Sequence, residues 1–173
     1  LFDCYEKIRS KVGRDYPVFI KLNAADNIDN GLEKDDGVKI AEMLSRAGID
    51  AIEVSSGTPA SGDTGPARKD INSIEKQGYN LDLAQAVKER VACPVISVGG
   101  FRSLDVAQKA VSENLADYIA LSRPLIRQPD LPTIWQKADS NTAECISCNK
   151  CFMPGLTKGG IYCVPLKSKN NSR

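Results

Sequence analysis

The chain has 173 residues, of which 42% are hydrophobic and 26% are charged, and its formal net charge is +1. This length is enough for one domain with its own hydrophobic core. The near-neutral charge argues against a nucleic-acid-binding surface, which would show a basic excess. No uninterrupted apolar run approaches the roughly 20 residues needed to cross a bilayer. We therefore expect neither a nucleic-acid partner nor a membrane partner.

Short apolar strands alternate with amphipathic helices along most of the chain. In chain order the pattern predicts a helix that ends at Gly13, strands over residues 17–22, 51–54, 94–98 and 117–121, and helices over residues 33–47, 81–91 and 104–111, followed by a last helix that contains Ile134 and Trp135. The residues that can cap the helices after them are Asn80, Ser103 and Asp130. Alternation of this kind implies a parallel sheet with helical crossovers.

The predicted fold class is α/β, with about four βα units that make half of a (β/α)8 TIM barrel. A doubly wound open sheet is the alternative. The lack of a GxGxxG motif after the first strand makes a dinucleotide-binding sheet of that kind a weaker interpretation of the sequence. Residues 55–79 are rich in Gly, Ser, Pro and Asp and show no clear periodicity. Because this segment follows the C-terminal end of a strand, where barrel active sites are built, we expect it to be a functional loop.

Two segments that could bind phosphate follow the last two predicted strands. Gly99, Gly100 and Phe101 follow one strand, and Ser122 and Arg123 follow the next. Glycines let backbone N–H groups approach phosphate oxygens closely, and an arginine adds a charge-assisted contact. The alternative is a tight turn at the glycines and a solvated arginine. Their occurrence at consecutive strand ends favours a phosphate site, as in many barrels.

Lys21 lies inside an apolar strand, between Ile20 and Leu22. Burying an ammonium group is costly unless an anion or a polar site meets it. Strand alternation points Lys21 away from its two neighbours and toward the barrel interior. One interpretation is a structural ion pair with Glu53 on the next strand. The functional interpretation is a cation beside an electron-accepting ring, where it stabilises the negative charge of the reduced ring.

Four segments of the sequence resemble the Old Yellow Enzyme family of flavin oxidoreductases. The segments similar to its fifth strand, its last two strands and its final helix are residues 17–23 (PVFIKLN), 94–101 (PVISVGGF), 116–126 (ADYIALSRPLI) and 129–132 (PDLP). The resemblance implies the C-terminal half of an FMN-binding TIM barrel over residues 1–139, followed by a cysteine-rich tail over residues 140–173.

This resemblance also implies roles for individual residues. The loop over residues 99–101 and the pair Ser122 and Arg123 match positions that hold the FMN phosphate. Lys21 takes the place of a basic residue, usually arginine, near the flavin N1–C2=O edge, and lysine keeps the charge but loses the planar fork. In the complete enzyme, hydride is expected to pass from NAD(P)H to FMN and then to an acceptor such as an activated alkene.

The catalytic residues of the family are expected outside this sequence. Its first four strands supply flavin-ring contacts, a histidine or asparagine pair that binds the substrate oxygen, and usually a tyrosine proton donor. The chain has no histidine and begins without an initiator Met or a signal-like segment, so we expect it to be part of a longer polypeptide. We expect the missing N-terminal half-barrel to be its partner, the isolated chain to be inactive, and self-association to be an alternative.

Four of the six cysteines cluster near the end of the chain, and they are Cys145, Cys148, Cys151 and Cys163. Close-spaced thiolates with a distant fourth suit an iron–sulfur cluster; a four-cysteine zinc site and a reduced, metal-free tail are the alternatives. The cluster resembles the tail of dienoyl-CoA-reductase-like and trimethylamine-dehydrogenase-like enzymes, where a [4Fe–4S] cluster passes electrons to FMN. Because a disulfide scaffold would spread its cysteines through the chain, we expect a reducing, cytoplasmic location.

Two functions of other classes are compatible with the same pattern. Glycines and an arginine at strand ends would serve any phosphate, so a flavin-independent barrel enzyme such as an isomerase or lyase is one alternative. The other is a non-enzymatic half-barrel that acts only as an assembly module through its exposed sheet edges.

Overall fold

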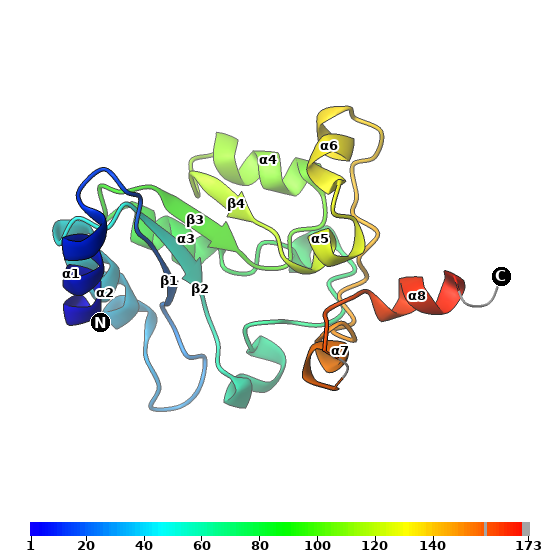
Figure 1. Ribbon diagram of the computed structural model, residues 1–173, viewed down its shortest axis with the longest axis horizontal. Coiled ribbons are helices and arrows are strands. Elements are labelled where there is room, and N and C mark those ends of the chain that lie inside the picture. The colour runs from blue at the N-terminus through cyan, green and yellow to red at the C-terminus, as the bar shows by residue number, and fades with distance from the viewer. Residues whose placement is uncertain (158, 171–173) are drawn as a thin grey trace.

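The computed structural model describes residues 1–157 and 159–170, and its centre is a parallel sheet (Figure 1). The four strands are β1 (Phe19–Asn23), β2 (Ala51–Ser55), β3 (Val95–Val98) and β4 (Tyr118–Ala120). Their order in the sheet follows their order in the chain, and each neighbouring pair is parallel. A doubly wound sheet would reverse its strand order at a switch point. The structure therefore confirms half a barrel wall, and the doubly wound alternative is wrong.

Helices connect and follow the strands. They are α1 (Phe2–Val12), α2 (Lys34–Arg46), α3 (Leu81–Lys88), α4 (Leu104–Ser112), α5 (Arg123–Arg127), α6 (Leu131–Gln136), α7 (Phe152–Thr157) and α8 (Val164–Asn170). The long segment after β2 contains two 3-10 helices, η1 (Pro59–Thr64) and η2 (Ile74–Lys76). The sequence pattern predicted neither these nor α5, α7 and α8. Among the described residues, none of the helices is long and apolar enough to span a membrane.

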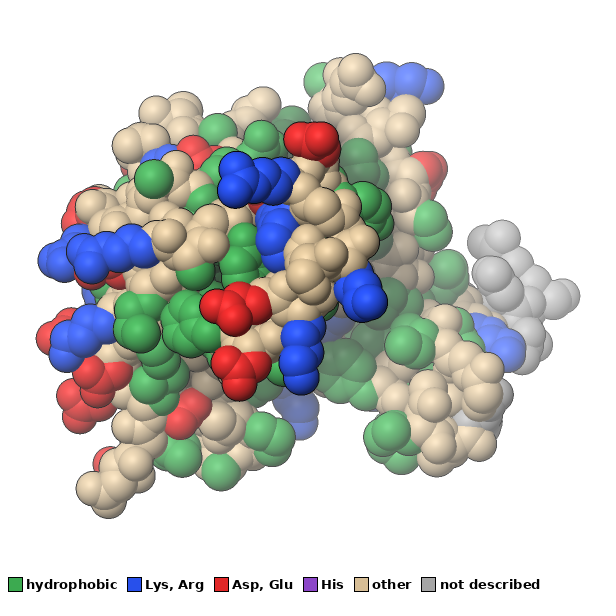
Figure 2. All heavy atoms as spheres, turned by 60° about the vertical axis from the view of Figure 1, so that its left-hand side comes forward, with side chains coloured by type: hydrophobic (Ala, Val, Ile, Leu, Met, Phe, Trp, Pro, Cys, Tyr) green, Lys and Arg blue, Asp and Glu red, His purple; other side chains and the backbone are tan. Residues whose placement is uncertain are grey.

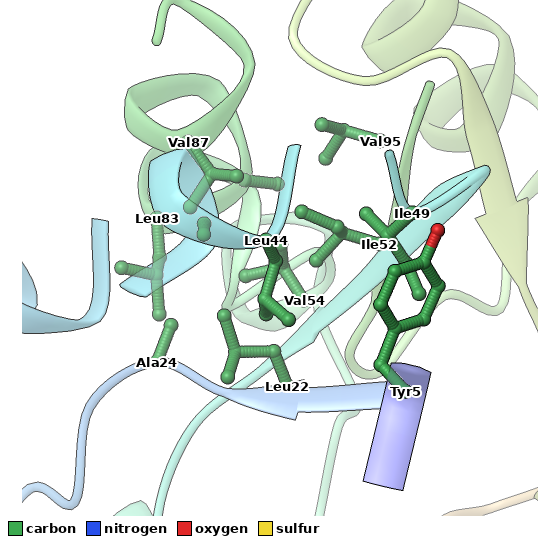
Figure 3. Close-up of a cluster of buried hydrophobic side chains, with 12 residues drawn as sticks. Tyr5, Leu22, Ala24, Leu44, Ile49, Ile52, Val54, Leu83, Val87 and Val95 are labelled. Carbon is green, nitrogen blue, oxygen red and sulfur yellow. The ribbon is translucent and has the colours of Figure 1, made fainter. Parts of the chain in front are cut away.

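One face of the sheet packs against α2 and α3 and forms the main hydrophobic core (Figure 3). Leu44 of α2 and Val87 of α3 are fully buried over Ile52, Val54 and Val95 of the strands. Burying a side chain of this size stabilises the fold by about 1.5–3 kcal/mol. This core fixes which side of each strand faces the helices.

The opposite face of the sheet, which we call the inner face, carries the alternate side chains of each strand. Lys21, Glu53, Ile96 and Tyr118 lie in register across the four strands. Phe19, two residues before Lys21, is 61% exposed, and Tyr118 is 60% exposed. In a complete barrel, alternate residues of this kind fill the interior.

Two aspartates pin the amino ends of neighbouring strands. Asp50, directly before β2, accepts a hydrogen bond from the Val18 amide at 2.6 Å, and Asp117, directly before β4, accepts one from the Val95 amide at 2.8 Å. Each carboxylate also forms an ion pair with a basic side chain of the helix before the strand that it holds: Asp50 with Arg9 in α1, before β1, and Asp117 with Lys88 in α3, before β3. The same arrangement therefore sets the start of β1 and of β3.

The three residues predicted to cap helices stand at the N-cap positions without making the capping bonds, and they are Asn80, Ser103 and Asp130. Asn80 instead accepts a hydrogen bond from the Ser56 hydroxyl and donates one to the Val98 carbonyl, both at 2.6 Å. Ser103 accepts one from the Gln77 amide at 2.8 Å. The prediction of capping bonds was wrong. At Asn80 and Ser103 the reason is that the side chains bond to the loops around the strand ends instead.

The charged side chains on the face shown in Figure 2 are mixed in sign. Basic and acidic side chains alternate there with hydrophobic ones, and neither sign forms an extended patch on that face. One group of opposite charges forms ion pairs at α2, where Glu42 contacts both Arg46 and Arg90.

Candidate functional site

All six predicted flavin-binding residues line one cavity of about 200 Å³ at the carboxyl ends of the strands, and they are Lys21, Gly99, Gly100, Phe101, Ser122 and Arg123. We call it the strand-end cavity. The rest of its wall includes Pro66, Ala67 and Tyr79 from the long loop after β2, and Ser147 and Phe152 from the tail. The sequence did not indicate that the tail closes this cavity. Figure 1 shows α5 lying beyond the carboxyl ends of β3 and β4.

Tyr79 explains why two glycines follow β3. A Cβ at Gly100 would lie 2.9 Å from the Tyr79 ring and one at Gly99 would lie 3.0 Å from it, which is closer than real Cβ atoms normally approach. Gly100 also has a φ of 71°, a conformation that suits glycine. The ring is held by a hydrogen bond to the Pro66 carbonyl at 2.9 Å and by the Arg68 guanidinium, 4.2 Å from its centroid. The two glycines are therefore needed to leave room for the Tyr79 ring, whether or not a ligand is bound.

Arg123 is buried at the cavity wall, with 9% exposure. Its Nη1 donates to the Arg68 carbonyl at 2.7 Å and to Asn149 Oδ1 at 2.6 Å. Within the described part of the chain, no hydrogen bond involves its Nε or Nη2. An arginine carries five N–H donors, so the three on Nε and Nη2 are left for a further partner such as an anion. The neighbouring Ser122 is exposed and offers a hydroxyl beside them.

Lys21 forms the ion pair with Glu53 that one interpretation of its position predicted. Its ammonium group forms an ion pair with Glu53 on β2, and the Lys21 side chain is 56% exposed on the inner face. Lys21 nevertheless lines the strand-end cavity. The carboxylate therefore holds the cation at the cavity rim.

The four clustered cysteines line a second cavity of about 190 Å³, which we call the cysteine cavity; they are Cys145, Cys148, Cys151 and Cys163. Arg123 and Arg127 of α5 line the same cavity. Arg127 pairs with Glu144 through Nη2 at 2.6 Å, and its Nη1 lies 3.9 Å from the Cys163 sulfur. Two basic side chains therefore line the cavity that the four sulfurs share.

The side chains that line the cysteine cavity are not gathered around one point. Among residues 1–157 and 159–170, no three His, Cys, Asp or Glu side chains are grouped closely enough to hold one metal ion. Zinc needs four ligands within roughly 2.0–2.3 Å of a single ion. Sulfurs that hold a [4Fe–4S] cluster bind different iron atoms and lie farther apart. Burial raises the pKa of the Cys151 thiol, so metal binding there must displace a proton.

Comparison with known proteins identifies the family. Residues 1–142 match the NADH:flavin oxidoreductase / NADH oxidase family. The chain belongs to this family. It is 35% identical over 144 residues to the NADH oxidase of Thermoanaerobacter brockii, a match that covers 83% of this chain and 22% of that protein. The resemblance to the Old Yellow Enzyme family is thereby confirmed.

Solved structures of other proteins share the fold. The complex of 2-naphthoyl-CoA reductase with 2-naphthoyl-CoA superposes with a TM-score of 0.74 at 29% identity and covers 87% of this chain and 22% of that one. An Old Yellow Enzyme homologue from Zymomonas mobilis gives a TM-score of 0.60 at 19% identity and covers 84% of this chain and 38% of that one. The chain thus spans well under half of the length of these relatives.

Proposed function

We propose that this chain provides the FMN-phosphate site of an NAD(P)H-dependent flavin oxidoreductase. The observation that carries the proposal is the convergence of all six predicted residues on the strand-end cavity. The remaining N–H donors of Arg123 and the Ser122 hydroxyl suit the phosphate. Membership of the NADH:flavin oxidoreductase family supports FMN as the cofactor and NAD(P)H as the electron donor.

When bound, FMN would accept hydride at its ring and pass it to an acceptor, which we propose to be an activated alkene. Lys21, held by Glu53 at the cavity rim, would lie beside the ring and stabilise its negative charge after reduction. Tyr79 and the glycine pair would fix the loop that carries the phosphate contacts. The residues that polarise the acceptor would come from an N-terminal half-barrel, so the isolated chain is expected to lack enone reductase activity.

We further propose that the cysteine-rich tail of residues 140–173, of which residues 158 and 171–173 lie outside the described part of the chain, follows the half-barrel of residues 1–139 and holds a [4Fe–4S] cluster. The four cysteines share one cavity, and two arginines line it. Four of the six cysteines cluster instead of spreading through the chain as in a disulfide scaffold, which supports the reducing, cytoplasmic location that we propose. Such a cluster would supply one-electron transfer at the edge of the flavin site.

The test is a visible absorption spectrum of anaerobically purified protein, with flavin and iron assayed on the same sample. Flavin bands with bound FMN would support the phosphate site, and a broad brown absorbance with iron would support the cluster. Arg123→Lys is expected to weaken FMN binding about tenfold, because it loses the planar fork while keeping the charge. Arg46→Lys, on the exposed end of α2, is the matched control and is expected to leave FMN affinity unchanged.

Failure to bind FMN would contradict the flavin site. If such a protein still bound inorganic phosphate with the same dependence on Arg123, a flavin-independent phosphate enzyme would become the better assignment. An iron-free sample after anaerobic reconstitution with iron and sulfide would contradict the cluster alone.

A further inference from the structure

A single guanidinium lies between the two cavities. Arg123 lines both the strand-end cavity and the cysteine cavity. Its Nη1 donates to Asn149 Oδ1 at 2.6 Å and lies 3.5 Å from the Ser147 carbonyl, so it contacts two residues of the cysteine segment. The same nitrogen donates to the Arg68 carbonyl in the long loop at 2.7 Å. One side chain therefore fastens the tail and the long loop to α5.

Asn149, in the tail, also connects the cysteine segment to the wall of the strand-end cavity. It lies in sequence between Cys148 and Cys151 and lines the cysteine cavity. Its Nδ2 donates to the Ala67 carbonyl at 2.6 Å, and Ala67 lines the strand-end cavity. Asn149 has a φ of 58°, a left-handed conformation that asparagine tolerates better than most residues. The position of the cysteine segment thus depends on contacts with the wall of the strand-end cavity.

We propose that Arg123 and Asn149 couple the two cavities, so that a phosphate group bound in the strand-end cavity orders the segment that carries Cys145, Cys148 and Cys151. A phosphate would engage the Nε and Nη2 donors of Arg123. Because the guanidinium is planar and rigid, fixing those donors also fixes Nη1 and the segment bonded to it. The inference rests on the proposed function, since FMN is taken to supply the phosphate.

Thermodynamic linkage makes this coupling reciprocal. If FMN orders the cysteine segment, then whatever orders the cysteine segment must tighten FMN binding by the same factor. The coupling would set an order of cofactor binding: FMN binds first, and the chain then holds its clustered thiols in fixed positions. Such a role makes Asn149 a positioning residue, because it acts through Arg123 and touches no reacting atom.

The test measures alkylation of each cysteine by iodoacetamide in the reduced, metal-free full chain, with and without saturating FMN. Quenching of FMN fluorescence reports binding in the same samples, and mass spectrometry resolves the individual thiols. We expect FMN to slow alkylation of the three clustered cysteines by about fivefold or more. Cys4, which is exposed, and Cys93, which lies before β3, serve as internal controls whose rates should not change.

Asn149→Gly tests the role of the side chain, since glycine adopts the left-handed conformation without penalty. We expect this variant to bind FMN while the ratio of alkylation rates with and without FMN falls to about one. Asn114→Gly is the matched control, because Asn114 also has a left-handed backbone, with φ 60°, and follows α4. A merely structural role of Asn149 would raise both rates together and leave the ratio unchanged.

The outcomes distinguish the proposed flavin site from the proposed coupling. Absence of FMN quenching would overturn the proposed flavin site and the coupling with it. FMN quenching without protection of the clustered cysteines in the unmodified chain would overturn the coupling and leave the flavin site standing. Equal protection in the unmodified chain and in Asn149→Gly would overturn the role of Asn149.

Discussion

Gly100 carries two constraints at once, a left-handed backbone and direct contact with the Tyr79 ring. We expect Gly100→Ala to destabilise the fold by about 2–4 kcal/mol, since it adds overpacking against the ring to backbone strain. Gly48→Ala is the control, because Gly48 also has a positive φ but its Cβ would meet only the Tyr5 hydroxyl at 3.4 Å. That variant should cost about 1 kcal/mol in urea unfolding. Equal costs for the two variants would show that Tyr79 moves aside freely.

The sequence indicated some of the residues that meet at the strand-end cavity and missed others for a physical reason. Arg123 and Gly100 could be predicted because parallel strands bring their carboxyl ends to one edge, whatever the loops do. Tyr79 and Asn149 could not, since their roles depend on where an aperiodic loop and the tail fold back. Lys21 is intermediate: its direction followed from strand alternation, but only the structure shows that the ion pair with Glu53 and the place at the cavity rim coexist.

At the scale of elements, the starts of the strands depend on proline and aspartate. β1 begins at Phe19 rather than at Pro17 as predicted, because proline has no N–H to donate and the next amide bonds to Asp50. β3 likewise begins after Pro94, with the Val95 amide bonded to Asp117. The helix α5 was missed because five residues are too few to show a helical period. Element boundaries thus depended on tertiary contacts, whereas the order of the elements followed from hydrophobic periodicity alone.

Asp117→Asn is expected to lower the free energy of unfolding and to make that free energy less sensitive to acid pH. Burial raises the pKa of Asp117, but the hydrogen bonds from Lys88 and from the Val95 amide outweigh burial and leave the pKa below its ordinary value. A lowered pKa in the folded state gives stability that is present above the unfolded value of about 3.9 and is lost as pH falls through the folded pKa. The variant should lose about 1 kcal/mol at pH 7.

Urea unfolding midpoints at several pH values from 7 down to 3 would check this. The unmodified chain should lose stability more steeply below about pH 4 than Asp117→Asn does. Asp63→Asn is the matched control, because Asp63 is exposed on η1 and should leave the pH profile unchanged. Parallel profiles for all three proteins would show that Asp117 does not carry the acid sensitivity.

The whole molecule presents a sheet that is covered on one face only. Helices α2 and α3 bury the outer face, while the inner face exposes Phe19 and Tyr118. β1 and β4 are the two edges of the sheet that the structure describes, so each offers unpaired backbone groups to another chain. In a closed barrel both edges are paired and the inner face is filled. An isolated half-barrel is therefore expected to associate with an N-terminal half-barrel or with a second copy of itself.

Substitution of the inner face tests this expectation for the isolated chain. We expect the 173-residue chain to self-associate with increasing concentration, and the double variant Phe19→Ser, Tyr118→Ser to weaken association at least about tenfold, because burying each aromatic side chain contributes about 2 kcal/mol. Sedimentation velocity over a range of concentrations would measure it. Tyr16→Ser is the control, since Tyr16 is 62% exposed but lies before β1 and outside the inner face. A chain that stays monomeric at all concentrations would contradict self-association. A different half-barrel would then be the expected partner of the inner face.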